Sequence, residues 1–383
     1  MKLLIFCPFY PPHIGGLETH ALEFNRHIAP SVKSILVFTP QLPESAPVRE
    51  TEGNITILRF PAFEPIHNYP VPKFWNTDFW RQWHALSDDK YDIVISRTRF
   101  FFSSLMALCY SYRKNVRLLH IEHGSDFAQF NGQIKTALGK IYDWIFGRLV
   151  LRYADGIVAN SQASARFVSR LSSRLDISVI YRGTNIEAIE KCAPRQDLIE
   201  QYSDKNIIAF IGRLIDGKGV HDLILALSLL QRNDIVTFII GGGAEESRLK
   251  KMVEEHNLSN QVIFFGNLPF EKAISILKTA HIVVNPSYTE GLPTSVAEAA
   301  LCQKAIIATN VGGTSEVISG NNDGFLIPPR QPKVIAEKIS LLLDTPGLQT
   351  SISQAAFSKV QSKFSWHHAT DQYLEIFSAL HKK

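Results

Sequence analysis

The sequence predicts an α/β protein made of two doubly wound parallel sheets in tandem. Short apolar runs alternate with amphipathic helical patterns along the whole chain, which is typical of parallel strand–helix units. The length of 383 residues corresponds to two domains at roughly 150 residues per domain. Hydrophobic residues make up 45 % of the chain and charged residues 20 %, so there are enough apolar side chains for two cores.

The first half of the chain contains seven candidate strands with helical patterns between them. The strands are expected at residues 3–8, 34–38, 55–60, 92–96, 117–122, 156–159 and 179–181. The helices are expected at residues 18–28, 101–112, 135–153 and 163–172.

The second half repeats this alternation. Strands are expected at residues 207–211, 237–240, 262–265, 282–285 and 305–308, with helices at 220–231, 245–256, 295–302 and 334–343. A polar stretch between about 183 and 205 separates the halves, which predicts domains at 1–185 and 186–365. A last helix, 366–383, is a candidate for packing back on the first domain. Ligands of doubly wound sheets bind beyond the carboxyl ends of the strands, and two facing sheets would form a cleft there.

The net charge of +4 is unevenly distributed. Residues 1–185 carry 21 lysines and arginines against 15 aspartates and glutamates, whereas the remainder carries 19 against 21. A basic half suggests an anionic surface or ligand. Nucleic acid is not the expected partner, because the sequence has no helix-turn-helix, RNP or zinc pattern.

Several features indicate the compartment. The four cysteines are far apart and form neither a disulfide-like nor a metal-like cluster. No apolar run approaches the ~18 residues needed to span a bilayer. The start of the chain passes directly into Pro8, which is typical of a first strand and not of a signal peptide. We therefore expect a cytoplasmic protein.

The first motif is a glycine pair, Gly15-Gly16, between the first strand and first helix. Paired glycines allow the backbone to approach a ligand closely and to point amides at an anion. The alternative is a tight turn without a ligand. The glycine pair is not part of a dinucleotide-binding fingerprint, because the pattern Gly-x-Gly-x-x-Gly is absent and no acidic residue follows the next strand.

The second motif lies on the glycine-rich loop after the strand at 207–211. Arg213 and Lys218 are five residues apart on this strand-to-helix loop, so both side chains can reach one diphosphate. Two solvated cations are the structural alternative, which explains either residue singly better than it explains the pair.

The third motif runs from Asn285 to Ala300. Glu290 lies on a glycine-containing loop, and a helix begins near Thr294 or Ser295 with free amides and a positive dipole end suited to a phosphate. Glu298 lies one turn inside an apolar run, where we expect a buried carboxylate that needs a partner.

Together these motifs resemble those of retaining GT-B glycosyltransferases of the GT4 family. The resemblance covers nearly the whole chain, and the motifs occur in order. They are Pro-Pro-x-x-Gly-Gly-x-Glu at 11–18, His-Gly-x-Asp at 123–126, Asn160-Ser161, Gly-Arg-Leu with Lys-Gly at 212–219, Gly-Gly-Gly at 241–243, Phe265-Gly266, Pro286-Ser287, Glu-x7-Glu at 290–298, and Gly312-Gly313-x-x-Glu316 with Gly324.

The resemblance implies a GT-B fold, with two Rossmann-like domains facing across a cleft. It implies an acceptor-binding domain at 1–185, a domain at 186–365 that binds a nucleotide-sugar donor linked to UDP or GDP, and no divalent metal or other cofactor. Relatives that build lipopolysaccharide, capsule or glycolipids imply a lipid-linked or polysaccharide acceptor. They also imply peripheral contact with an anionic membrane at the inner face of the cytoplasmic membrane.

Residue roles follow by position from the same resemblance. His123, Arg213, Lys218 and Glu290 are the expected catalytic residues, with Arg213 and Lys218 on the diphosphate and Glu290 on the hydroxyls of the transferred sugar. The donor-binding set adds Gly15, Gly16, Gly291, Leu292, Pro293, Thr294, Ser295 and Glu298, the last on the ribose. Asp126 and His13 are candidates on the acceptor side. A lone histidine after a strand is more often structural, but its place in His-Gly-x-Asp favours a site.

Aromatic residues near cations suggest where an anionic bilayer could contact the first domain. Phe74, Trp75, Phe79, Trp80 and Trp83 lie near Lys73 and Arg81, and Phe100, Phe101 and Phe102 follow Arg97 and Arg99. The alternative is a partly buried helix with ordinary core aromatics.

Two other functions remain open at this point. One is a catalytically inactive nucleotide-sugar-binding subunit that scaffolds a glycan-assembly complex, which the intact Arg213, Lys218, Glu290 and His123 disfavour. The other is a nicotinamide-dependent dehydrogenase, which the first glycine loop disfavours.

Overall fold

The computed structural model describes residues 1–13, 15–66, 69–127, 133–320 and 322–382. Ile14 of the predicted glycine loop and Lys383 at the end of the predicted last helix lie outside the described residues. The chain forms two compact units. Unit 1 comprises Met1–Arg182 with Trp366–Lys383, and unit 2 comprises Gly183–Ser365. The first division falls three residues before the boundary expected from the sequence.

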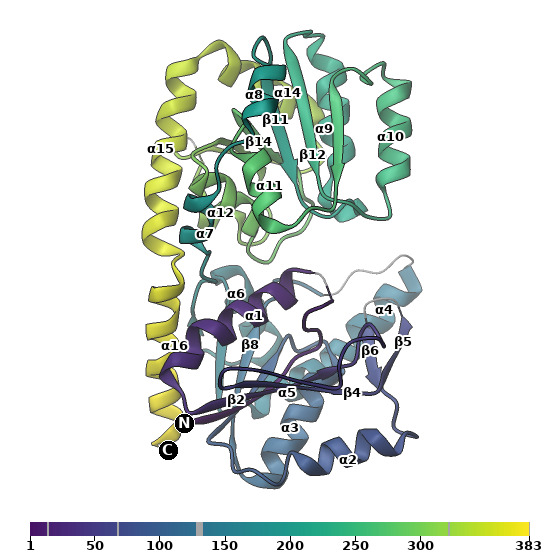
Figure 1. The fold of residues 1–383 in the computed structure, drawn as a ribbon, viewed down its shortest axis with the longest axis vertical. Helices are drawn as coiled ribbons and strands as arrows, with labels where there is room; N and C mark the ends of the chain where they lie inside the picture. Colours follow the sequence, from purple (N-terminus) through teal and green to yellow (C-terminus); the bar gives the residue numbers. More distant parts are fainter. Residues whose placement is uncertain (14, 67–68, 128–132, 321, 383) are drawn as a thin grey trace. The chain divides into compact units, whose positions relative to one another are not determined.

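Unit 1 contains the strands labelled β2, β4 and β8 in Figure 1. It is built on an eight-stranded sheet with the order β10-β9-β8-β7-β1-β2-β4-β3. All neighbours are parallel except β3 and β4. The strands are β1 (Lys2–Phe6), β2 (Ser34–Pro40), β3 (Arg49–Glu52), β4 (Ile55–Phe60), β7 (Ile93–Arg97), β8 (Arg117–Glu122), β9 (Gly156–Ala159) and β10 (Ile177–Val179), and a separate hairpin is formed by β5 (Ala62–Ile66) and β6 (Tyr69–Pro72).

Helices cover both faces of this sheet because successive residues of its buried strands point to opposite sides. In β1, Leu3 and Ile5 belong to the core under α1 and α16, whereas Leu4 and Phe6 belong to the core on the other face. The helices are α1 (Gly16–Ile28), followed by a short 3-10 turn at Ala29–Ser31, α2 (Thr77–Ala85), α3 (Phe102–Lys114), α4 (Gln133–Tyr142), a π-helical turn at Asp143–Gly147, α5 (Arg148–Tyr153), α6 (Gln162–Ser172) and α16 (Trp366–His381).

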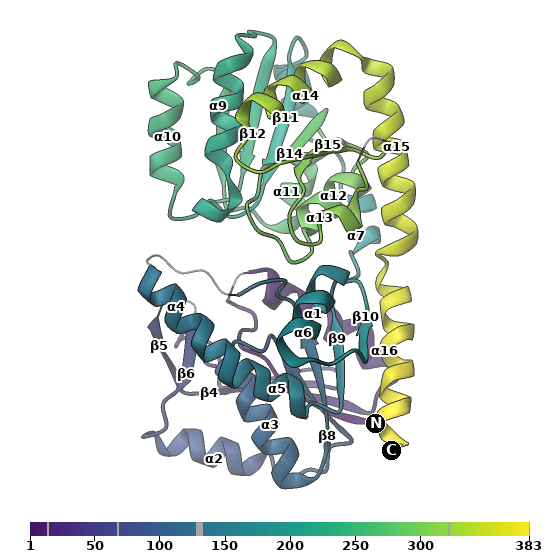
Figure 2. The ribbon, with the colours of Figure 1, turned by 180° about the vertical axis from the view of Figure 1, so that it is seen from behind.

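Helix α16 packs in unit 1 although it follows unit 2 in the sequence (Figure 2). Its buried side chains repeat at helical spacing and join the core that contains β1 and α1; they are Trp366, Ala369, Tyr373, Phe377 and Leu380.

Unit 2 is built on a six-stranded, all-parallel sheet with the order β13-β12-β11-β14-β15-β16. Its strands are β11 (Asn206–Ile211), β12 (Ile235–Ile240), β13 (Val262–Gly266), β14 (Ile282–Asn285), β15 (Ala305–Thr309) and β16 (Phe325–Ile327). Its helices are α7 (Ile186–Lys191), α8 (Gln196–Gln201), a 3-10 turn at Asp216–Lys218, α9 (Val220–Leu230), α10 (Glu246–Glu255), α11 (Phe270–Leu277), α12 (Thr294–Leu301), α13 (Thr314–Val317), α14 (Pro332–Asp344) and α15 (Pro346–Lys363).

Some sequence-based expectations about elements differ from the structure. The strand expected at 179–181 lies at Ile177–Val179. The helix expected at 135–153 is present and contains a π-helical turn at Asp143–Gly147. The short strands β3, β5, β6 and β16 were not predicted, because strands with exposed or mixed side chains carry little periodic signal. The helices α2, α7, α8, α11, α13 and α15 were not predicted either.

Candidate active site

The unit 2 sheet reverses its strand order between β11 and β14. β11 pairs with β12 on one side and with β14 on the other, so the loops that follow β11 and β14 start beside each other. The amide of Tyr288 donates to the carbonyl oxygen of Gly217 (2.8 Å), which joins the two loops. Gly219 has φ +62°, and a Cβ there would lie 2.2 Å from the Pro286 oxygen, so only glycine fits. This edge is where doubly wound sheets bind ligands.

Lys218 and Glu290 meet at this point from the two loops. Lys218 Nζ lies 2.6 Å from Glu290 Oε1, and the two side chains are 21 % and 9 % exposed. The sequence predicted both residues as site residues but not that they form an ion pair. A charged pair that remains within reach of solvent can exchange partners when a ligand enters, unlike a fully buried one.

Arg213 lies on the same loop and is exposed. Among the described residues its guanidinium makes no hydrogen bond or ion pair. Close backbone contacts hold the loops around it: a Cβ on Gly241 would lie 1.9 Å from the Gly212 oxygen, and one on Gly243 would lie 2.3 Å from the Leu214 oxygen. These contacts explain why Gly241 and Gly243 of the predicted glycine triplet are required for packing.

Helix α12 begins at Thr294, as expected, directly after Gly291, Leu292 and Pro293. Pro293 at the N-cap provides no side-chain acceptor for the first amides of the helix. The Ser295 hydroxyl accepts a hydrogen bond from Asn285 Nδ2 (2.9 Å), which ties the helix start to the end of β14. The sequence-based expectation for Glu298 was wrong in one respect: the residue is partly exposed and not buried.

Tyr288 and its neighbours were missed by the sequence reasoning. The Tyr288 hydroxyl donates to Asp222 Oδ2 (2.9 Å), and His221 Nε2 lies 2.5 Å from the Tyr288 hydroxyl oxygen. The Arg330 guanidinium lies over the Tyr288 ring, 3.9 Å from its centroid. Burial and the hydrogen bond to Asp222 raise the pKa of Tyr288, so the phenol stays neutral. Arg330 is a third cation near this loop.

In unit 1 the strand order reverses between β1 and β7, and His123 lies on the loop after the next strand, β8. Arg97 Nη1 donates to His20 Nδ1 (2.8 Å), because a guanidinium can only donate. His20 Nδ1 is therefore unprotonated. His123 Nε2, which lies 3.3 Å from it, carries a proton and donates to it. His123 Nδ1 then accepts from the Thr98 hydroxyl (3.2 Å). His20 and Arg97 were not predicted as site residues, since their positions within a helix and a strand gave no motif.

Both histidines of this chain of hydrogen bonds are neutral. Burial, with the nearby Arg97, lowers the pKa of His123 to about 3. Burial and the neighbouring His123 and Arg97 also lower the pKa of His20 well below its usual range. At neutral pH the His123 imidazole is therefore neutral.

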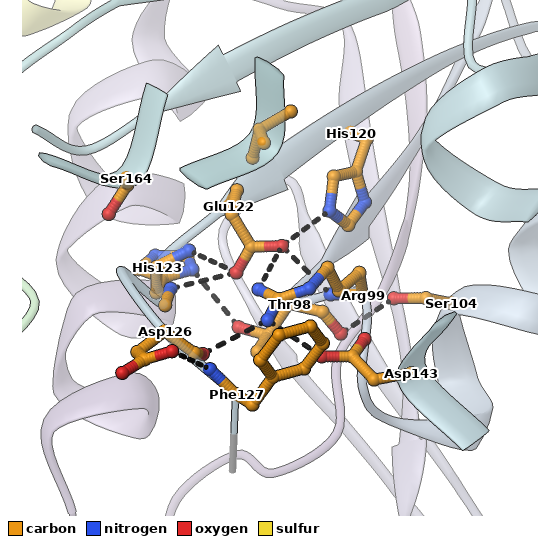
Figure 3. A network of polar contacts seen from close by, with 12 residues as sticks. Thr98, Arg99, Ser104, His120, Glu122, His123, Asp126, Phe127, Asp143 and Ser164 are labelled. Carbon is orange, nitrogen blue, oxygen red and sulfur yellow. Dashed lines mark hydrogen bonds and ion pairs between the residues drawn. The ribbon is translucent and has the colours of Figure 1, made fainter. Parts of the chain in front are cut away.

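A buried ionic network holds the loop that carries His123 (Figure 3). The Glu122 carboxylate accepts from the amides of His123 (2.9 Å) and Gly124 (2.7 Å) and lies 3.1 Å from Arg99 Nη1. Arg99 Nη2 lies 2.7 Å from Asp143 Oδ2 and donates to the Asp126 carbonyl oxygen (3.0 Å). These residues fix the loop 123–126 from both ends.

The two acids of the network have opposite pKa shifts. Burial acts to raise the pKa of Glu122, but Arg99, His120 and the Gly124 amide hold it well below its usual range. Burial raises the pKa of Asp143 to about 6, in spite of Arg99. Asp143 Oδ1 has no hydrogen-bond partner among the described residues, which agrees with this direction.

The start of α1 carries its own carboxylate. Glu18 is buried, and a Cβ on Gly15 would lie 2.4 Å from Glu18 Oε2. His13 Nδ1 lies 2.5 Å from Glu18 Oε1, and the carbonyl of Gly16 accepts from Arg182 Nη1 (3.2 Å). The Gly15-Gly16 pair, which the sequence predicts to face a bound anion, therefore lies next to the Glu18 carboxylate in this structure. Asp126 is exposed, and its Oδ1 accepts from the Phe127 amide (2.7 Å).

The predicted aromatic and cationic surface at 73–102 is corrected by the structure. Arg97 and Arg99 are 2 % exposed and bind groups inside unit 1, so they are not surface cations. Phe79 is buried in the core, whereas Trp75 and Trp80 are exposed. The sequence alone does not distinguish the buried positions from the exposed ones, because aromatic residues occupy both.

Two features are absent from the described residues. There, no three His, Cys, Asp or Glu side chains are gathered so that they could hold a metal ion. In the same part of the chain, no helix combines the length and the apolar character that crossing a membrane requires.

Comparisons with known proteins agree with this fold and arrangement. Residues 14–188 match the family model Glycosyltransferase Family 4, and residues 196–359 match Glycosyl transferases group 1. An uncharacterized glycosyltransferase of Methanocaldococcus jannaschii is 35 % identical over 388 residues, covering 99 % of each protein.

Solved structures show the same fold. Sucrose-phosphate synthase of Thermosynechococcus elongatus has a TM-score of 0.83 at 21 % identity, covering 99 % of this chain and 98 % of that one. HepE of Anabaena in complex with UDP has a TM-score of 0.78 at 20 % identity, covering 99 % and 100 %. The two parallel-sheet units and these matches define a glycosyltransferase of the GT-B fold. The chain belongs to glycosyltransferase family 4, the glycosyl transferases group 1.

Proposed function

We propose that this glycosyltransferase moves a sugar from a UDP- or GDP-sugar to a lipid-linked or polysaccharide acceptor in cell-envelope glycan biosynthesis. The transfer retains the anomeric configuration and requires no divalent metal. The observation that carries the proposal is the gathering of Arg213, Lys218 and Glu290 with the start of α12 at the switch point of the unit 2 sheet. A nucleotide-sugar donor is supported by the similar fold of HepE, which was crystallised with UDP and with UDP-glucose.

The charges at this edge suit the departure of a nucleoside diphosphate. When the bond between the anomeric carbon and the phosphate oxygen breaks, negative charge develops on the diphosphate and positive charge on the sugar. Lys218 and Arg213, with the dipole of α12, stabilise the diphosphate. Glu290 accepts hydrogen bonds from hydroxyls of the sugar, and Glu298 from those of the ribose.

Retention follows from a front-face reaction. The acceptor oxygen bonds to the anomeric carbon on the face that the phosphate leaves, and the acceptor proton passes to the leaving phosphate oxygen. His123 serves as a neutral hydrogen-bonding group, which its low pKa supports. Gly15, Gly16, Asp126 and His13 keep their predicted roles on phosphate or acceptor.

The test combines donor binding with turnover. A panel of UDP, GDP, ADP and their sugars is screened by thermal shift, where a donor at 100 times its dissociation constant should stabilise the fold by about 2.7 kcal/mol. Lys218→Ala and Glu290→Ala should each lower transfer on the order of 10²–10³-fold without unfolding the protein. Lys250→Ala is the matched control, since Lys250 pairs with Glu246 on the exposed side of α10. EDTA should leave turnover unchanged. Donor binding without any transfer or donor hydrolysis would instead favour a scaffold subunit.

A further inference from the structure

Tyr288 joins the two loops of unit 2 that carry Lys218 and Glu290. It lies two residues before Glu290 on the loop after β14. Its amide donates to the Gly217 carbonyl oxygen (2.8 Å), and its ring packs against Gly219, where an added Cβ would lie 3.2 Å from Tyr288 Cε1. Gly217 and Gly219 are the chain neighbours of Lys218, so Tyr288 contacts the residue on each side of that lysine.

The hydroxyl of Tyr288 extends this contact to the first turn of α9. It donates to Asp222 Oδ2 (2.9 Å), and His221 Nε2 lies 2.5 Å from the hydroxyl oxygen. Because the single hydroxyl proton goes to Asp222, His221 Nε2 is the donor in the second hydrogen bond. Helix α9 begins at Val220, two residues after Lys218. The hydroxyl therefore fastens Tyr288 to the helix that follows the lysine.

A third loop of the same unit covers the Tyr288 ring. Arg330 lies on the loop after β16, and its guanidinium is 3.9 Å from the ring centroid, which is a cation–π distance. Burial raises the pKa of Tyr288, as does the hydrogen bond to Asp222, so the hydroxyl keeps the proton that it donates. The side chain is thus held at its hydroxyl, at its ring edge and over its ring face, which leaves it little rotational freedom.

The two loops need a link that a bound donor does not disturb. In the free protein Lys218 Nζ lies 2.6 Å from Glu290 Oε1, and this attraction also holds the loops together. In the proposed reaction Lys218 turns to the diphosphate and Glu290 turns to hydroxyls of the sugar, so contacts with the donor replace their direct attraction. The contacts that Tyr288 makes with the Lys218 loop and with α9 use other atoms, and they persist when the donor is bound.

We propose that Tyr288 is a positioning residue for sugar transfer, which sets the spacing of Lys218 and Glu290 around the diphosphate and the sugar. This inference rests on the proposed function, because it concerns the same site. Tyr288 acts through Lys218 and Glu290 and not by contact with the donor. A displaced lysine loses most where charge develops on the leaving diphosphate, so kcat should fall while the KM for the donor changes little.

The test is the variant Tyr288→Phe, which removes only the hydroxyl. With the nucleotide sugar that the donor panel identifies, kcat should fall about tenfold or more and the KM for the donor should change less than about threefold. The matched control is Tyr202→Phe, which removes the hydroxyl of a partly exposed tyrosine of unit 2 that accepts from Gln201 Nε2 (3.0 Å). It should change neither constant. Circular dichroism checks that each variant is folded.

Two comparisons separate positioning from a general loss of stability. In the Lys218→Ala background, Tyr288→Phe should slow transfer less than about threefold, because the group through which it acts is already absent. A general loss of stability would multiply the two effects. Asp222→Asn keeps an oxygen that accepts from the Tyr288 hydroxyl, so it should retain more turnover than Asp222→Leu.

Hydrogen exchange tests the link without any donor. Amides of residues 215–219 and 286–290 should exchange about fivefold faster or more in Tyr288→Phe than in wild type, and at the wild-type rate in Tyr202→Phe. Wild-type kcat in folded Tyr288→Phe, multiplied effects in the Lys218→Ala background, or unchanged exchange would each overturn the inference. A wild-type protein that transfers no sugar would instead contradict the proposed function, and the exchange rates would still decide whether Tyr288 links the loops.

Discussion

At the scale of single residues, Glu122 shows how a buried charge shapes a loop. Its carboxylate accepts from two consecutive backbone amides, those of His123 and Gly124, and pairs with Arg99. An amide or an alkyl group could not accept from all of these donors, and Arg99 would keep only Asp143 as a charged partner. The residue before the predicted His-Gly-x-Asp motif is therefore as important to its geometry as the motif itself.

The variant Glu122→Gln should lower the free energy of unfolding by about 3 kcal/mol or more, because removal of one partner leaves a buried charge short of compensation. Urea unfolding at pH 7.5 measures this. Glu44→Gln is the control, since Glu44 pairs with Lys73 at an exposed site and should leave the stability nearly unchanged. Equal, small losses for both variants would mean that the Glu122 charge does not hold the loop.

The two neutral histidines predict a pH dependence of stability. A histidine with a lowered pKa in the folded state contributes stability that is present above its unfolded pKa of about 6.5 and is lost as the pH falls. Between pH 7.5 and 5.5, His20 and His123 should therefore both lower the free energy of unfolding, because they take up protons in the unfolded state and not in the folded state. Asp143, whose pKa is raised to about 6, acts in the opposite direction and restores part of this loss.

We therefore expect the free energy of unfolding to fall between these two pH values, since two histidines act against one carboxyl group. Urea unfolding curves at pH 7.5 and 5.5 measure the change. His123→Gln removes one of the two titrating histidines and should make the loss smaller. A wild-type protein with the same stability at both pH values would show that these histidines are not held neutral.

At the scale of elements, the loops at the switch point of unit 2 are packed backbone against backbone. Gly312, after β15, has φ +54°, and a Cβ there would lie 1.6 Å from the carbonyl oxygen of Glu290. The next amide, that of Gly313, donates to the Gly291 oxygen (2.8 Å). The position of Glu290 thus depends on the loop after β15, which is distant in sequence. This loop contacts the Glu290 loop through backbone atoms and not through a charged side chain.

The substitution Gly312→Ala should displace the Glu290 loop and lower the free energy of unfolding by about 1–3 kcal/mol, since both the φ angle and the contact are strained. Transfer should fall together with stability because Glu290 moves. Gly217→Ala is a close control: a Cβ there meets its nearest atom, Thr289 Cγ2, at an ordinary 3.9 Å, and the change should cost less than about 0.5 kcal/mol. Thermal unfolding and initial rates of both variants measure these effects. If the Gly312→Ala variant turned over substrate as fast as the wild type, the catalytic position of Glu290 would not depend on this contact.

At the scale of the whole molecule, unit 1 is assembled from two separate stretches of chain. Phe24 of α1 and Tyr373 of α16 have ring centroids 4.8 Å apart in an edge-to-face arrangement. The last helix therefore stabilises the unit that contains His123, although it follows unit 2 in the sequence.

Phe377→Ala should lower the free energy of unfolding of unit 1 by about 3–5 kcal/mol, because it removes a fully buried ring and leaves a cavity. Hydrogen exchange should show lost protection in β1 and α1, with unit 2 unchanged. The control is Glu375→Ala on the exposed side of the same helix, with an expected change of less than about 0.5 kcal/mol. Equal loss of protection in β11 and β14 would mean that the two units do not unfold separately.

The periodicity of the sequence was sufficient to predict the two parallel sheets and most of their strands. Buried parallel strands such as β11 and β15 are almost continuous apolar runs that cannot be mistaken for turns, and Gly219 and Gly312 occupy positions where no other residue fits the backbone. The motifs that indicated the family were local in sequence, and the comparisons confirmed that family.

Other features were decided only by the tertiary structure. The ion pair of Lys218 with Glu290, the contact of His123 with His20 and the burial of Arg97 and Arg99 each join side chains that are far apart in sequence. The side on which α4 and α5 are exposed is also set by packing, since an apolar stripe alone predicts burial. Local sequence determines which strands and turns form, because backbone preferences and side-chain periodicity act over a few residues. Partners, charge states and exposed faces depend on which distant segments the sheet order brings together.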